Sequence, residues 1–292
     1  MATLLFPLLC ALLYPLGTLL MKRGLDKGAD LAASLVINFW CMAAVFVPAF
    51  ALSDRAVPWD LCWQPLAVGL FSFAGQGCAI LAFSKGDLTI ATPALGSKVL
   101  IVALLTELLL GQAVPLPWWI AAGLSFAAVF FLQSGGRQER GAIMRTLIFS
   151  LLAAAFFALG DVLIQKWTPA WGAFYFLPPM AAATAIYSLA LLPLVRKPRF
   201  GFAWPTWKWL LAGGSVFGIQ SLLLTAVIGL YGQVTLVNIV FSSRGLWNFV
   251  LVWFLGHWFR NTERAAGRGV MGRRLVGAGL MFAAILIVSL RR

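Results

Sequence analysis

The feature that most constrains this chain is a series of apolar blocks, each about as long as a helix that crosses a bilayer. Hydrophobic residues make up 62% of the 292 residues and charged residues only 11%, which excludes an ordinary soluble globular domain. A helix needs about 20 apolar residues to cross roughly 30 Å of hydrocarbon. The sequence therefore predicts an all-α polytopic membrane protein with ten transmembrane helices, at about residues 2–21, 31–52, 64–84, 88–110, 117–134, 143–165, 171–194, 208–229, 233–256 and 274–290.

Short pieces of sequence recur in the same order in the two halves of the chain. LLCALLYPLG resembles LLAAAFFALG, FAGQ resembles FGIQ, and AGLSFAA resembles AGLMFAA; the pairs begin at Leu8 and Leu151, Phe73 and Phe217, and Ala122 and Ala278. This pattern predicts two five-helix repeats, residues 1–136 and 142–292. Because each repeat has an odd number of helices, the two are inverted relative to each other in the membrane. Inverted repeats place substrate sites near the midplane, at the interface between the repeats.

The formal net charge of +13 comes mostly from cations in the short connections between apolar blocks. This distribution is typical of the positive-inside rule rather than of a nucleic-acid-binding face. Counting Lys and Arg by side places both termini outside. The four cysteines have no metal-ligand spacing and His257 is the single histidine, so neither a metal site nor a cofactor is expected.

Two cations lie within predicted spans, at equivalent places in the two halves. Aligning the segments that begin at Thr89 and Thr235 places Ser97-Lys98 on Ser243-Arg244. A charge at the centre of a spanning helix costs roughly 2.5–3.5 kcal/mol. We therefore expect both cations to face a central cavity and to bind a phosphate or carboxylate, Arg244 through two prongs and Lys98 as a point charge. The alternative is that they form structural ion pairs and never meet a substrate.

Two acidic residues are candidate partners for these cations. Glu107 follows Lys98 by nine residues, which is about 180° around a helix, so the two point to opposite faces. Asp161 lies at a better depth, at the position that Thr18 occupies in the first half. It could neutralise a cation in the empty state, carry a coupling proton if burial raises its pKa, or form a plain structural pair.

Several neutral residues complete the predicted site. Gln76 and Gln220 recur at one position of the two halves and line the cavity or join helices by hydrogen bonds. Trp247 and Asn248 follow Arg244 by three and four residues and so share its helix face. The weaker candidates are polar residues that can equally be packing positions: Ser97, Asn238, Ser243 and Tyr14.

The chain resembles the drug/metabolite transporter superfamily in its ten-helix form with two EamA-like repeats. The resemblance rests on Lys22-Arg23 after the first block, on GDLTIATPAL at 86–95, and on LLLGQ at 108–112 followed by Pro115 and Pro117. Members commonly have glutamate after this glycine, where this chain has Gln112. The resemblance implies a transporter with cytoplasmic termini, against the charge count. SSR at 242–244 is also similar to the basic position in the ninth helix of the sugar-phosphate branch, which implies a cation that contacts substrate phosphate.

Together these features predict a secondary transporter rather than an enzyme. It would move a small anionic or zwitterionic metabolite by alternating access at a midplane site. The alternatives are a lipid-headgroup flippase on the same fold and a polytopic membrane enzyme, which nine acidic residues and one histidine disfavour. The expected partners are a small-molecule substrate and membrane lipid but no nucleic acid. We expect a monomer or weak dimer in the plasma (bacterial inner) membrane.

Overall fold

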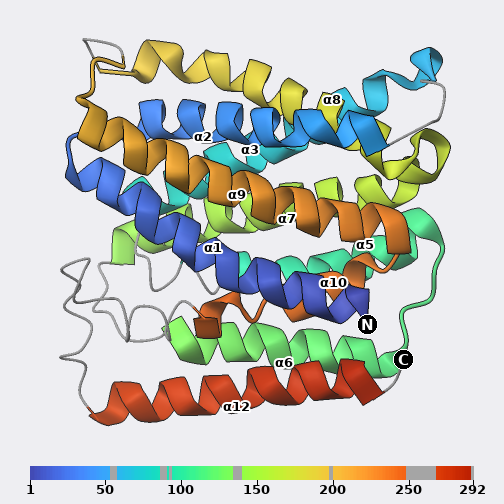
Figure 1. Ribbon diagram of the computed structural model, residues 1–292. Coiled ribbons are helices and arrows are strands. Elements are labelled where there is room, and N and C mark those ends of the chain that lie inside the picture. The colour runs from blue at the N-terminus through green and yellow to red at the C-terminus, as the bar shows by residue number, and fades with distance from the viewer. Residues whose placement is uncertain are drawn as a thin grey trace.

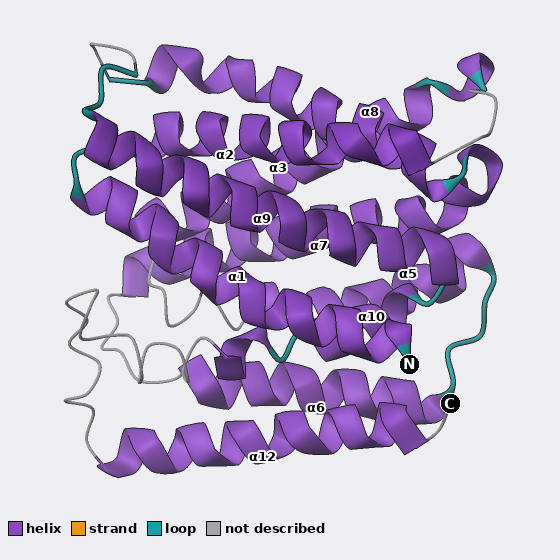
Figure 2. Cartoon of the chain, in the orientation of Figure 1, coloured by secondary structure: helices purple, strands orange, loops and turns teal. Residues whose placement is uncertain are grey.

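The computed structural model describes residues 1–52, 58–85, 91, 94–133, 140–196, 200–247 and 268–290, and every regular element in these ranges is a helix (Figures 1 and 2). The α-helices are α1 (Ala2–Asp26), α2 (Leu31–Phe46), α3 (Trp63–Lys85), α5 (Lys98–Leu110), α6 (Leu116–Gln133), α7 (Arg140–Trp171), α8 (Ala173–Ser188), α9 (Trp204–Tyr231), α10 (Val234–Phe241) and α12 (Arg268–Leu290). Single 3₁₀ segments extend or precede some of them: η1 (Val47–Leu52), η2 (Trp59–Leu61) and η3 (Leu189–Leu194).

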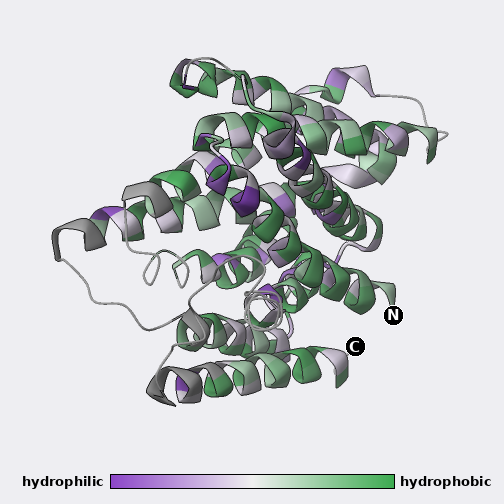
Figure 3. Cartoon of the chain, turned by 60° about the vertical axis from the view of Figure 1, so that its left-hand side comes forward, coloured by the Kyte–Doolittle hydropathy of each residue, from purple (hydrophilic) through white to green (hydrophobic). Residues whose placement is uncertain are grey.

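Six of the described helices are long and apolar enough to cross a membrane. They span Ala2–Asp26, Leu31–Leu52, Trp59–Ala82, Met144–Trp171, Ala173–Leu194 and Trp204–Tyr231. Shorter apolar helices occupy Leu116–Phe131 and Leu275–Leu290. Apolar residues cover most of the helix surfaces (Figure 3). The prediction of an all-α polytopic membrane protein is confirmed, whereas the count of ten helices and the inverted repeat stay predictions.

The predicted spans that carry the two cations are not simple continuous helices. A turn at Ser97 directly precedes Lys98, the first residue of α5. In the other half, α10 ends at Phe241, and a turn at Ser242 and Ser243 separates it from helical residues 244–247. Both cations therefore directly follow a break in a helix, which apolar periodicity alone does not reveal.

Glycine ends α5 and α9. Gly111 after α5 has φ 65° and Gly232 after α9 has φ 62°, a left-handed conformation that costs glycine little. Their N–H groups donate to the carbonyls of Glu107 and Ile228. Each helix thus stops sharply at its glycine.

The two halves of the chain interleave rather than form separate lobes. α1 and α2 of the first half pack along α9, and α3 packs along α7 and α8. α6 and α12 pack on each other at one side of the molecule (Figure 1). Small residues bring α9 close to α1 and α2: a Cβ on Gly213 or Gly214 would lie 2.8 Å from Met21 or Cys41. Close approach at glycine is a common way for membrane helices to pack.

Candidate functional site

An ion pair joins the two halves near the start of α5. Lys98 Nζ lies 2.7 Å from Asp161 Oδ2 on α7, and each side chain is only 13% exposed. Asn238 Nδ2 on α10 donates to the same Asp161 oxygen at 2.8 Å and to the Val234 carbonyl at 3.1 Å. One carboxylate oxygen therefore holds groups from two other helices. Charge-assisted hydrogen bonds of this kind are the stronger ones in proteins.

Glu107 lies away from this pair. Its Oε1 accepts hydrogen bonds from the Val114 N–H at 3.0 Å and from Trp119 Nε1 at 3.1 Å. It makes no ion pair with any residue that the structure describes. Glu107 therefore fastens the linker between α5 and α6. The structure separates it from Lys98, as helix geometry predicted, and pairs Lys98 with Asp161, the candidate that depth favoured.

The second cation, Arg244, lies among aromatic rings. Its Cζ is 4.7 Å from the Tyr14 ring centroid and 4.8 Å from that of Phe241. Tyr14 in turn makes edge contacts with Phe217 and Phe241. Arg244 has no carboxylate partner in the described part of the chain, yet it lies close enough to Lys98 for the two charges to interact. Aromatic faces stabilise a guanidinium but do not neutralise it.

The two cation sites correspond across the repeat seen in the sequence. Lys98 lies over the Phe157 ring, 6.0 Å from its centroid, and the aligned segments place Phe157 at the position of Tyr14. Each cation therefore lies over the equivalent ring of the opposite half. The same alignment places Asp161 on Thr18, whose hydroxyl donates to the Tyr14 carbonyl at 3.0 Å. The acid that pairs with Lys98 thus has no acidic counterpart near Arg244.

The other predicted site residues have varied surroundings. Gln220 is buried at 4% exposure, and Gln76 is half-buried with no hydrogen bond to a described residue. Ser97 Oγ donates to the Ala94 carbonyl, whereas Ser243 Oγ is buried without a described partner. Trp247 packs against the main apolar core. Asn248 lies outside the described residues.

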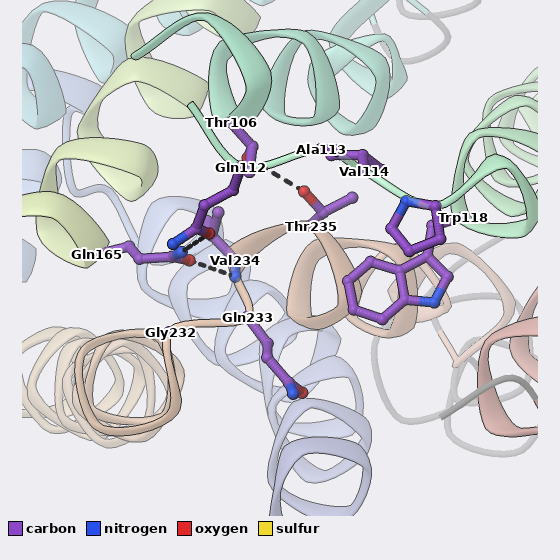
Figure 4. A pocket seen from close by; sticks show the side chains of 11 residues that line it. Thr106, Gln112, Ala113, Val114, Trp118, Gln165, Gly232, Gln233, Val234 and Thr235 are labelled. Carbon is purple, nitrogen blue, oxygen red and sulfur yellow. Dashed lines mark hydrogen bonds between the residues drawn. The ribbon is translucent and has the colours of Figure 1, made fainter. Parts of the chain in front are cut away.

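A small polar cavity of about 50 Å³ lies one turn beyond the ion pair, where the two glycine-ended linkers meet (Figure 4). Gln165 Nε2 donates to Gln112 Oε1 at 2.9 Å, and Gln165 Oε1 accepts from the Val234 N–H at 2.7 Å. The hydroxyls of Thr106 and Thr235 are 3.1 Å apart. These bonds join α5 and its following linker to α7 and to the start of α10.

Sequence reasoning did not single out this polar group. The signal available was the pair Gly-Gln at 111–112 and again at 232–233. Gln165 follows Asp161 by one helical turn on α7, and Val234 precedes Asn238 by one turn on α10. The Asp161–Asn238 and Gln165–Val234 hydrogen bonds therefore both join α7 to α10, at levels one helical turn apart.

Apolar helices of membrane-spanning length define a multi-pass integral membrane protein, and a buried ion pair joins its two halves. Residues 1–134 match the model of the EamA-like transporter family. This match supports membership of the drug/metabolite transporter superfamily and indicates a membrane transporter of that type.

The fold also resembles that of a solved structure. A solved structure titled "Crystal structure of protein" superimposes with a TM-score of 0.80 over 100% of this chain and 99% of that chain, at 17% sequence identity. At that identity the likeness establishes the fold alone. No curated protein sequence matches this chain.

Proposed function

We propose that this protein is a secondary transporter of a small anionic or zwitterionic metabolite in the plasma membrane. It works by alternating access with ten helices in two inverted repeats, residues 1–136 and 142–292. It acts as a monomer or weak dimer without a cofactor. The observation that carries the proposal is an uncompensated charge: Asp161 neutralises Lys98, whereas Arg244 has no described acidic partner.

We expect Arg244, a cation without a described acidic partner inside a predicted membrane span, to bind an anionic ligand. A charged side chain inside the bilayer costs roughly 2.5–3.5 kcal/mol, and contacts with two rings return only part of that, about 1–2 kcal/mol. The Tyr14 and Phe241 rings lie against the guanidinium. A carboxylate or phosphate oxygen on the remaining N–H groups would supply the missing negative charge in a two-pronged contact.

The start of α5 adds to the positive character of the site. Lys98 is the first residue of a 13-residue helix, and the Ser97 side chain makes no capping bond to it. The N–H groups at a helix start carry a partial positive charge and favour anions. Transporters with broken helices place such ends at the anionic part of the substrate.

Helix packing supports the repeated arrangement that alternating access requires. Exchanging each helix with its counterpart turns the α1–α9 contact into the α7–α3 contact, and the α5–α7 contact into the α10–α1 contact. Both members of each pair of contacts are present. The reciprocal placement of each cation over a ring of the other half agrees with the same exchange.

The test is a thermal-stability screen of the detergent-purified protein against panels of organic anions, zwitterions and cations. A ligand that binds only the folded state raises its apparent stability by RT ln(1 + [L]/Kd). We expect anions or zwitterions to stabilise the parent protein but not Arg244→Ala. Lys208→Ala is the matched control, because Lys208 lies over the Trp209 ring at the exposed start of α9. Stabilisation by organic cations alone, unchanged in Arg244→Ala, would refute the proposal.

A further inference from the structure

The two equivalent cation positions differ in their neighbours, because only one of them has a described acidic partner. Lys98 faces the Asp161 carboxylate, whereas the residue at the place of Asp161 in the first half is Thr18, a neutral hydroxyl bonded to its own helix. The described centre therefore holds two cations and one anion. Its net charge is one positive unit.

The Asp161 carboxylate is held in position by groups from two other helices. Its Oδ2 accepts from Lys98 and from Asn238 at once, and Asn238 is itself 2% exposed and bonded to the Val234 carbonyl. Because Asn238 on α10 also binds the carboxylate, the orientation of the Asp161 side chain does not depend on Lys98 alone.

We propose that Asp161 is the residue that sets the charge selectivity of the transporter, so that the site takes a ligand with one negative charge and rejects one with two. This inference rests on the proposed function. A monocarboxylate on Arg244 brings the centre to neutrality. A dianion would leave a net negative charge in apolar surroundings, next to the Asp161 carboxylate, and a like charge at close range in such surroundings is strongly unfavourable.

The experiment compares two four-carbon probes that differ by one carboxylate, butyrate and succinate, at constant ionic strength. Dissociation constants come from the rise in unfolding temperature with probe concentration. We expect the parent protein to prefer butyrate. Asp161→Asn keeps the size and the polar contact with Asn238 but leaves two uncompensated cations, so it should shift the preference toward succinate by about tenfold or more.

Thr18→Asp is the second variant, and it should act in the opposite direction. It places a carboxylate at the position equivalent to Asp161, one turn from Tyr14, whose ring contacts Arg244. The centre then carries no net charge, so binding of both probes should weaken and succinate should weaken more. This variant leaves the Lys98–Asp161 pair intact, so it tests the inference even where Asp161→Asn is unstable.

Glu107→Gln is the matched control, because it removes another acid of the helix bundle that contacts only the linker after α5 and Trp119. Its preference between the probes should equal that of the parent. If Asp161→Asn binds both probes as the parent does, the inference is wrong while the proposed function stands. If neither the parent nor any variant binds either probe, and cationic probes stabilise them all, the proposed function and the inference both fail.

Discussion

At the scale of single residues, the guanidinium of Arg244 is held by two aromatic rings. The Tyr14 and Phe241 rings lie at nearly equal distances from its guanidinium carbon, 4.7 and 4.8 Å, and are 83° apart in orientation. Rings this far apart in orientation contact the planar guanidinium from different directions. They hold the side chain in place, and the N–H groups that do not meet a ring stay available to a ligand.

Tyr14 tests the contribution of the ring. Replacing it by Leu removes the aromatic face under Arg244, so the free energy of unfolding should fall by about 1 kcal/mol. Tyr14→Phe is the control, because it keeps the ring and removes only a hydroxyl for which the structure describes no partner. Thermal unfolding of the two variants in the same detergent gives the answer. Equal stability of the two would mean that the ring does not hold the guanidinium.

At the scale of the helices, glycine decides how closely α9 approaches its neighbours. A Cβ on Gly214 would lie 2.8 Å from Cys41 Cβ on α2, closer than real Cβ contacts, whereas one on Gly279 of α12 would meet nothing within 4 Å. The two positions have the same residue type and helical conformation. They differ in whether another helix lies against them.

This pair gives a matched prediction. Gly214→Ala forces α9 and α2 apart and should lower the free energy of unfolding by about 1–3 kcal/mol. Gly279→Ala adds a methyl group in open space and should change stability by less than about 0.5 kcal/mol. Unfolding in detergent measures both. A Gly214→Ala protein as stable as Gly279→Ala would show that the close packing of α9 against α2 does not limit stability.

At the scale of the whole molecule, the apolar blocks made the helical membrane fold predictable, because each span satisfies its own backbone hydrogen bonds. The Lys98–Asp161 pair was also within reach, since helix geometry set Glu107 aside and depth favoured Asp161. Asn238 was only a weak candidate and Gln165 was not considered. Their partners lie 77 and 69 residues away in sequence, so only the packing of α7 against α10 reveals these contacts.

The contact between Thr106 and Thr235 offers a test of alternating access. Their hydroxyls are 3.1 Å apart across α5 and α10, close enough for cysteines at both positions to form a disulfide. In a background without Cys10, Cys41, Cys62 and Cys78, the crosslink should hold this end shut. Uptake of the tightest-binding ligand into proteoliposomes should then fall severalfold on oxidation and return on reduction.

The two single-cysteine variants are the controls for this crosslink and should be insensitive to oxidation. Full uptake by the oxidised double variant would show that this end of the molecule does not open during transport.

The unequal partners of the two cations have a geometric consequence. In the proposed inverted repeat, a site with matching partners would offer a ligand two equivalent orientations. Asp161 pairs with Lys98, whereas the equivalent residue of the other half is Thr18, a hydroxyl bonded to its own helix, so the Lys98 end of the described centre carries a compensating acid and the Arg244 end does not. The two ends of the proposed site therefore differ in charge. An elongated ligand should bind in one preferred orientation, although the helices around it are related by the proposed repeat.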